Sequence, residues 1–319
     1  MNSDSDLQLI DVGEAHTVAA SNLTRVYSYG WNDCYQLGKP IDKRKYIYSP
    51  SPINLPIEQA RAKSLAVGDN HNLLVDAYGN LYVWGDNSKG QLGLGHSRDM
   101  PKISILDFLQ NDTISEIKAK GNNSLVVTEQ GKAYYWPIQK ESGEIITKPV
   151  EMTLPPKIQV ATAACGYNFA ALVSKNGLVF TFGRDNQFGQ LGHGDTKPRE
   201  IPTLVESLKN DGEKISSVAC GYKHVICKTS LGKVYTWGWG EMGQLGHDNF
   251  ENLYTPKIVS AFSSTFKNKT LMVQAGFKHS MVLTETKKVF WWGTNATIDR
   301  QPVPVELNFA HKVRIRKSF

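Results

Sequence analysis

The chain alternates apolar and polar residues in short runs, and one such run recurs six times. Each copy is rich in β-branched and aromatic residues and ends in an aromatic residue followed by glycine, or by proline in the third copy. Alternation of this kind favours a half-buried β-strand, so we expect six equivalent strands. The copies end at Gly30, Gly85, Pro137, Gly183, Gly238 and Gly293.

Two further motifs stay in phase with these runs. A glycine after small residues precedes each run, at Gly13, Gly68, Gly121, Gly166, Gly221 and Gly276. Three residues later the chain has His16, His71, His224 or His279, with Ser124 and Phe169 in the third and fourth copies. A Gln-Leu-Gly triplet follows four of the runs, beginning at Gln36, Gln91, Gln190 and Gln244. Phased motifs over nearly the whole chain indicate a repeat protein, with repeats that start near residues 7, 60, 113, 158, 213 and 269.

Each repeat is predicted to form four antiparallel strands. In the fifth repeat these are Ser217–Gly221, His224–Thr229, Val234–Trp237 and Thr255–Val259, with a tight turn at Leu231–Lys233. Proline is tolerated on an edge strand, so the fourth strand should be the outer one. Repeated four-stranded units are typical of a β-propeller, and we predict an all-β fold in which residues 1–319 form one propeller domain. The recurrent aromatic residues, such as Trp84, Phe182, Trp237 and Trp292, are expected to fill the gaps between adjacent blades.

These residues resemble a known family. The glycine-to-histidine segment, the aromatic-glycine strand and the N-x-x-G-Q-L-G loop (Asn87–Gly93, Asn186–Gly192) are similar to the regulator of chromosome condensation repeat, over about residues 7 to 307. The resemblance implies a β-propeller, which usually has seven blades in that family. Six complete repeats are present here, so we expect six blades, or seven with a partial last blade.

The segment 311–319 has the pattern of the opening strand of a further repeat. Its basic residues alternate with two apolar ones, which is a strand pattern with one apolar face. We interpret it as a closing strand made of Lys312, Val313, Arg314, Ile315 and Arg316.

Composition and charge limit the cellular compartments in which we expect the protein. The net charge of +6 is only mildly basic, no apolar run approaches the length of a membrane span, and the polar, acidic N-terminus shows no secretory signal. The four cysteines do not form a disulfide scaffold, and Cys165, Cys220 and Cys227 are interpreted as buried free thiols. We therefore expect an intracellular protein without membrane insertion, cytoplasmic or cytoskeletal first and nuclear as the alternative.

The repeated histidines allow a metal-binding interpretation, in which all four would point into a central channel. The favoured interpretation is structural: each histidine occupies the same place in its repeat and bonds to the backbone of its own blade. The sequence shows no phosphate-binding loop, no nucleophile elbow and no zinc-ligand spacing. We expect no catalytic site, no metal and no cofactor.

Two surfaces are candidates for binding a partner. The loop after each repeat glycine carries aromatic and basic residues in the last three repeats, whereas the first three repeats have Glu14-Ala15, Asp69-Asn70 and Asn122-Asn123. Exposed aromatics beside charge are typical interface anchors, although these rings could also fold over their neighbours as packing, and the two interpretations weigh about evenly. The candidate residues in these loops are Tyr167, Tyr222, Lys223, Phe277 and Lys278.

The second candidate surface is a basic segment in the first repeat. It contains Lys43, Arg44 and Lys45, with Tyr46 and Tyr48 next to them. Phosphate or an acidic protein surface could bind there. The favoured alternative is that the charges protect an edge strand from aggregation.

These observations favour a non-catalytic scaffold or protein–protein interaction module. The family resemblance supplies an alternative, a guanine-nucleotide exchange factor for a small GTPase that is associated with chromatin. Exchange activity needs a protruding insertion, and no long insertion between strands is visible. Nucleic acid is not expected as a partner, because the sequence has no basic N-terminal arm.

Overall fold

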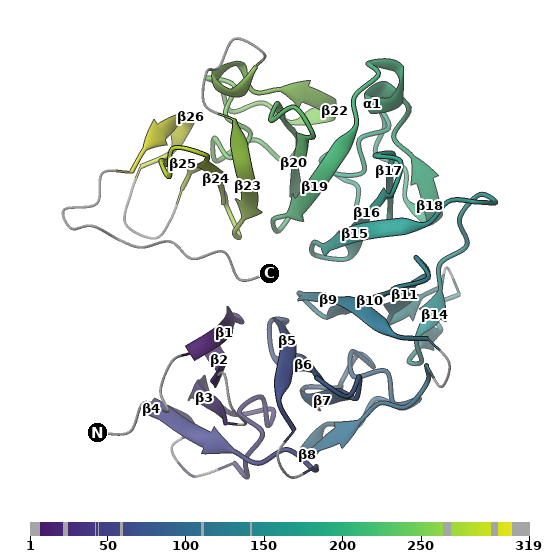
Figure 1. Cartoon of the computed structure of the whole chain (residues 1–319), viewed down its shortest axis with the longest axis vertical. Coiled ribbons are helices and arrows are strands. Elements are labelled where there is room, and N and C mark those ends of the chain that lie inside the picture. Colours follow the sequence, from purple (N-terminus) through teal and green to yellow (C-terminus); the bar gives the residue numbers. More distant parts are fainter. Residues whose placement is uncertain are drawn as a thin grey trace. The chain divides into compact units, whose positions relative to one another are not determined.

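The computed structural model describes residues 7–21, 25–41, 43, 45–57, 60–109, 112–140, 142–263, 269–294 and 299–307. The all-β prediction is confirmed, because these residues form six four-stranded antiparallel sheets, one for each repeat, and one two-stranded sheet (Figure 1). The chain divides into two compact units, Met1–Met152 and Thr153–Lys317. The prediction of one propeller domain over 1–319 stays a prediction, and each unit is described by itself.

The first unit contains three blades, in which each sheet runs in chain order from the first strand to the fourth. The first blade is formed by β1 (Leu7–Val12), β2 (His16–Ser21), β3 (Val26–Trp31) and β4 (Tyr46–Ile53). The second is formed by β5 (Ala62–Val67), β6 (His71–Asp76), β7 (Leu81–Gly85) and β8 (Met100–Ile105). The third is formed by β9 (Ile114–Lys120), β10 (Asn123–Thr128), β11 (Ala133–Trp136) and β14 (Val150–Glu151).

The third blade differs from the others where its Gln-Leu-Gly loop would be. A hairpin of β12 (Ile138–Gln139) and β13 (Ile145–Ile146) lies between β11 and β14 and forms the two-stranded sheet. This short insertion was not expected from the sequence.

The second unit contains the other three blades. The fourth blade is formed by β15 (Val160–Cys165), β16 (Phe169–Ser174), β17 (Val179–Gly183) and β18 (Arg199–Leu204). The fifth is formed by β19 (Ile215–Cys220), β20 (His224–Thr229), β21 (Val234–Gly238) and β22 (Leu253–Ile258). The sixth is formed by β23 (Thr270–Ala275), β24 (His279–Thr284), β25 (Val289–Gly293) and β26 (Gln301–Glu306). The helices of the described residues are α1 (Glu206–Asn210) and a 3-10 turn at Ser260–Phe262. Neither is long enough to cross a membrane.

The fifth repeat shows why the sequence forms this unit. Gly232 has a φ of +89°, which suits glycine in the tight turn between β20 and β21. The β-branched and aromatic residues of β21 are buried on both faces. Tyr235 and Trp237 pack in a cluster with residues of the fourth blade, and Val234 packs in a cluster with residues of the sixth. Pro256 lies in β22, which is the edge strand of its sheet, so the predicted position of the proline strand is confirmed.

Aromatic side chains fill the seams between adjacent blades within each unit, as predicted. Trp84 is fully buried in a cluster that combines residues of the first two blades. Its indole N–H donates to the backbone carbonyl of Gln36 in the preceding repeat, at 3.1 Å. Trp136, Trp237 and Trp292 donate in the same way to the carbonyls of Gln91, Gln190 and Gln244, at 2.8–2.9 Å. Each of the four Gln-Leu-Gly loops therefore joins its blade to the next blade of the same unit.

Three of the repeated histidines, His16, His71 and His224, contact side chains of the next repeat, so the interpretation of bonding to backbone in their own blade was wrong for these three. Nε2 of His16 lies 2.9 Å from Oδ1 of Asn72, Nε2 of His71 lies 2.9 Å from Oγ of Ser124, and Nε2 of His224 lies 3.0 Å from Oγ of Ser280. Each of these contacts crosses to the next repeat. The histidines therefore belong to the seams between blades.

The third repeat also has a different alignment from the one that the sequence suggested. Ser124 pairs with Trp136 across the strands, as Asn72 pairs with Trp84. Ser124 is thus the equivalent of Asn72, and Asn123 occupies the histidine position. Lys120 pairs with Asn123, as Gly68 bonds to His71, so the loop has the same length as in the second repeat. Its glycine lies one residue later, and counting from that glycine displaced the alignment by one residue.

Candidate functional site

The loops that precede the second strand of each blade in the second unit bring the predicted aromatic residues together. The backbone N–H of Tyr167 donates to the carbonyl of Tyr222 at 3.0 Å, and the N–H of Tyr222 donates to the carbonyl of Phe277 at 3.3 Å. These bonds set the spacing of the three loops. The ring centroids of Tyr167 and Tyr222 lie 4.4 Å apart, and those of Tyr222 and Phe277 lie 4.0 Å apart in a stacked arrangement.

The two predicted lysines lie beside this aromatic stack. Nζ of Lys223 lies 5.5 Å from the centroid of the Tyr222 ring, and Nζ of Lys278 lies 5.6 Å from that of Phe277. Each ammonium is thus in range of a cation–π interaction with the ring next to it in sequence. Lys223 also pairs with the carboxylate of Asp185 at 3.4 Å.

Two aromatic residues of the site were missed by the sequence reasoning. Phe188 and Trp239 follow the aromatic-glycine strands of the fourth and fifth repeats, and their ring centroids are 5.9 Å apart. Lys223 lies 4.9 Å from the Phe188 ring, and Lys278 lies 5.9 Å from the Trp239 ring. Each lysine therefore lies between a ring of its own repeat and a ring of the preceding one. The sequence signal that could have identified them is a large aromatic residue close to a Gln-Leu-Gly triplet. We call these residues, Tyr167, Tyr222, Phe277, Lys223, Lys278, Phe188 and Trp239, the loop-end cluster.

The burial of the loop-end cluster supports both interpretations of its rings, as anchors for a partner and as packing over neighbouring residues. Phe277 is 51% exposed, whereas Tyr167 and Tyr222 are half-buried. Stacked aromatic pairs contribute about 0.5–1.5 kcal/mol beyond their buried area. The two tyrosines therefore stabilise the loops, and Phe277 presents a large apolar surface to solvent.

The basic segment of the first unit is a separate surface. Lys43 and Lys45 are exposed, and Arg44 lies outside the described residues. The carbonyl of Lys45 accepts a hydrogen bond from the N–H of Asn32, and the rings of Tyr46 and Tyr48 lie 4.5 Å apart. Partner binding by this segment stays a prediction. The closing strand, Lys312 to Arg316, also lies outside the described residues.

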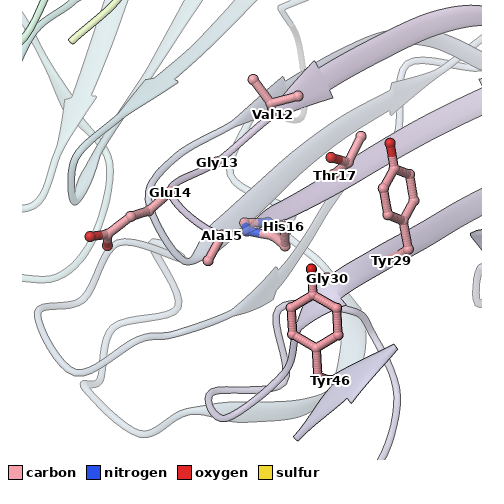
Figure 2. A pocket seen from close by; sticks show the side chains of 9 residues that line it. All are labelled: Val12, Gly13, Glu14, Ala15, His16, Thr17, Tyr29, Gly30 and Tyr46. Atoms are coloured by element: carbon pink, nitrogen blue, oxygen red, sulfur yellow. The ribbon is translucent and has the colours of Figure 1, made fainter. Parts of the chain in front are cut away.

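The first blade carries a pocket of about 250 Å³ (Figure 2). Val12, Glu14, His16, Tyr29 and Tyr46 are among the residues that line it. In the second, fifth and sixth blades the equivalent glycines, Gly85, Gly238 and Gly293, lie against a glutamine of the preceding repeat. The atoms nearest to a Cβ placed on Gly30 belong instead to residues 15 and 16. The pocket is thus the first blade's counterpart of the seam that holds a Gln-Leu-Gly loop in other blades.

Burial favours the neutral forms of two seam histidines and of the Cys34 thiol. Burial lowers the pKa of His71 to about 3, and burial also lowers the pKa of His16. Burial, with the nearby Asp33 carboxylate, raises the pKa of the Cys34 thiol to about 12, so that thiol is protonated at neutral pH. The described cysteines are all free, and Cys165, Cys220 and Cys227 are buried as predicted. Within the described ranges, no three or more His, Cys, Asp or Glu side chains are grouped to hold a metal ion.

The repeated four-stranded blades and their Gln-Leu-Gly seams define a β-propeller of the RCC1 type. The family model for the RCC1-like domain matches residues 1–301, and the chain belongs to this family. The resemblance inferred from the repeat motifs is therefore confirmed.

The chain is similar to proteins from plants and animals. The chain is 32% identical to the ultraviolet-B receptor UVR8 of Arabidopsis thaliana over 295 residues, which cover 90% of this chain and 65% of the receptor. It is 34% identical to the secretion-regulating guanine nucleotide exchange factor of Bos taurus over 231 residues, 67% of this chain and 48% of that protein. It is 26% identical to the human E3 ubiquitin-protein ligase HERC2 over 95% of this chain but only 6% of the ligase. The chain thus spans less than two thirds of each of these relatives.

Solved structures agree on the fold. Human WBSCR16 superposes with a TM-score of 0.81 at 21% identity, over 96% of this chain and 83% of that one. Prp20p of Saccharomyces cerevisiae, which was described together with its binding to Gsp1p and histones, superposes with a TM-score of 0.73 at 22% identity, over 86% of this chain and 67% of that one.

Proposed function

We propose that this RCC1-like protein is a non-catalytic interaction module that binds a protein partner through the loop-end cluster of its second unit. The observation that carries the proposal is the stack of Tyr167, Tyr222 and Phe277, which ends in a half-exposed ring and is flanked by Lys223 and Lys278. Rigid aromatic anchors beside positive charge are common at the centres of protein interfaces.

The proposal includes an intracellular setting, and it names a first class of partner to examine. Free buried thiols such as Cys165 and Cys220 suit a reducing compartment. Among the relatives, one is a guanine nucleotide exchange factor and another was described with its binding to Gsp1p. Small GTPases are therefore the first proteins to test for binding. We expect binding without exchange, so that nucleotide release from each GTPase stays at its spontaneous rate.

The experiment compares partner capture by the wild-type protein and by Phe277→Ala, alone and together with Tyr167→Ala and Tyr222→Ala. Loss of an interface anchor costs about 2 kcal/mol or more, which is roughly a thirtyfold loss of affinity. We expect Phe277→Ala to weaken binding with little change in Tm, because half of its ring is exposed. The triple variant should also lower Tm, since it removes two stacked pairs.

The matched control removes exposed apolar side chains elsewhere. Tyr78 and Leu231 are 77% and 73% exposed in turns at the other end of their blades. Tyr78→Ala with Leu231→Ala should leave capture unchanged. If Phe277→Ala captures the same partners as strongly as the wild type, the rings serve packing alone and the proposal is wrong.

A further inference from the structure

The Gln-Leu-Gly loops of the two units differ in one hydrogen bond of the glutamine side chain. In the first unit, Nε2 of Gln36 donates to Oδ1 of Asn70 at 3.2 Å, and Nε2 of Gln91 donates to Oδ1 of Asn122 at 3.3 Å. Asn70 and Asn122 each directly precede the second strand of their blade. An asparagine at this loop position therefore accepts the amide proton of a glutamine that is fully buried.

The fifth and sixth blades, in the second unit, have lysine at the same loop position. Lys223 and Lys278 directly precede β20 and β24, and a lysine ammonium has no acceptor to offer. Gln190 and Gln244 are fully buried, and among the described residues their Nε2 atoms have no hydrogen-bond partner.

The amides of these glutamines are held in a fixed orientation. Oε1 of Gln190 accepts from the N–H of Phe188 at 3.1 Å, and Oε1 of Gln244 accepts from the N–H of Met242 at 2.9 Å. Oε1 of Gln91 accepts in the same way from the N–H of Lys89. With the oxygen fixed as it is in the first unit, the Nε2 group of Gln244 is directed toward the loop position of Lys278.

The seam between the fifth and sixth repeats has a third donor in addition to Nε2 of Gln244 and Nζ of Lys278. The indole Nε1 of Trp239 is buried and has no partner within the described part of the chain. Lys278 lies 5.9 Å from the Trp239 ring. Lys223 has the Asp185 carboxylate as its counter-ion, whereas no described carboxylate lies within salt-bridge distance of Lys278. Three donors, one of them the positively charged Lys278, thus occur at one seam where the described residues supply no acceptor.

We propose that this seam binds a carboxylate from an acidic segment of the partner, which accepts from Nζ of Lys278, Nε2 of Gln244 and Nε1 of Trp239. The inference rests on the proposed function and adds the chemistry of the ligand. A carboxylate supplies two oxygens with several lone pairs and the missing negative charge, so it satisfies buried donors that an apolar contact would leave unpaired. The stack ending at Phe277 provides the adjacent apolar contact.

The test uses the whole protein labelled with ¹⁵N in its tryptophan side chains. The probe is an octapeptide of glutamate and serine, blocked at both ends, so that its carboxylates are side chains. A second peptide of serine and alanine with a free C-terminus distinguishes a terminal carboxylate from a side-chain one. The Trp239 indole signal is assigned with Trp239→Phe. We expect this signal to shift and saturate with the glutamate peptide, and to shift much less with the second one.

The decisive variant rebuilds the hydrogen bond of the first unit. Lys278→Asn gives Gln244 the acceptor that Gln36 has in Asn70, and we expect it to weaken peptide binding at least tenfold without lowering Tm. Lys287→Asn is the matched control, because it removes the same charge from an exposed turn at the other end of β24. Asparagine tolerates the positive φ of 62° at that position. This control should bind the peptide like the wild type.

The outcomes separate this inference from the proposed function. If the Trp239 signal does not move with the glutamate peptide, or if Lys278→Asn binds that peptide like the wild type, the carboxylate site is wrong. A larger shift with the free C-terminus would replace the side-chain carboxylate by a terminal one and overturn the acidic segment. If Phe277→Ala loses partners that Lys278→Asn retains, the interaction module stands and the carboxylate inference falls.

Discussion

A single buried histidine links the second blade to the third. His71 is fully buried, its Nε2 contacts Oγ of Ser124, and Ser124 donates to the carbonyl of Gln91 at 2.7 Å. At the equivalent seam between the fourth and fifth repeats the two positions are Phe169 and Val225. The chain therefore contains a polar and an apolar version of one seam, and the residues change as a pair.

The paired change can be tested by converting the polar seam into the apolar one. Ser124→Val alone leaves a buried histidine nitrogen without its partner, and we expect a loss of about 1–3 kcal/mol in the free energy of unfolding. Adding His71→Phe should recover most of this loss, because the pair then matches Phe169 and Val225. Urea unfolding of Ser124→Val, His71→Phe and the double variant measures the coupling energy between the two positions. If the double variant is as unstable as the sum of the two single changes, the seams are not equivalent.

The same variants carry a pH dependence. The pKa of His71 is lowered to about 3 by burial, while an unfolded histidine titrates near 6.5. Between these values the unfolded state binds more protons, so stability falls as the pH falls below 6.5. We expect the Tm of the double variant, relative to that of the wild type, to be higher at pH 5 than at pH 8. An equal difference at the two pH values would contradict the buried neutral histidine.

At the scale of an element, the hairpin of the third repeat takes the place of a Gln-Leu-Gly loop. The chain that follows β13 packs on the loop of the second repeat, where the N–H of Gly95 donates to the carbonyl of Thr147 at 3.2 Å. A Cβ placed on Gly90 would lie 2.7 Å from Cβ of Thr147. Contact between the hairpin segment and the second blade thus depends on a bare glycine.

This contact predicts that alanine in place of two glycines, Gly79 and Gly90, lowers the stability of the protein by different amounts. Gly79 and Gly90 have φ values of +91° and +83°, so alanine strains the backbone at both positions by on the order of 1–3 kcal/mol. A Cβ placed on Gly79 would have no atom within 4 Å, whereas one on Gly90 would meet Thr147. We expect Gly90→Ala to destabilise the protein by about 1 kcal/mol more than Gly79→Ala, in chemical unfolding. Equal losses would show that the hairpin segment does not pack there.

The repeat motifs predicted the elements well, because each strand is defined by residues close together in sequence. The turn at Gly232, the edge strand with Pro256 and the buried aromatic Trp237 all follow from local pattern. The loop-end cluster was predicted only in part. Tyr222 and Lys223 are visible as a repeated pair, but the contact of Lys223 with Phe188 joins two repeats across a seam. That the amide nitrogen of Gln244 has no partner among the described residues depends on three-dimensional placement, which no spacing in the sequence reveals.

At the scale of the whole molecule, the described residues leave one face of the first strand of the first blade exposed. Ile10 and Val12 of β1 are 62% and 61% exposed. Val12 also lines the pocket, which occupies the place where the second, fifth and sixth blades have a glutamine of the preceding repeat (Figure 2). Exposed apolar strand residues invite association with other chains. The exposed carboxylate of Glu14 at the pocket would attract a basic segment.

We expect residues 312–316 to cover this face as a closing strand. Val313 and Ile315 supply an apolar side, and Lys312, Arg314 and Arg316 supply charge opposite to that of Glu14. Deletion of residues 311–319 should then lower Tm and promote self-association, measured by differential scanning fluorimetry and light scattering. Val313→Asp with Ile315→Asp should reproduce both effects, whereas changing the three basic residues to glutamine should have a smaller effect on Tm. The rival interpretation is a solvated basic tail that binds an anionic partner, for which the deletion would leave Tm unchanged and reduce only salt-sensitive binding.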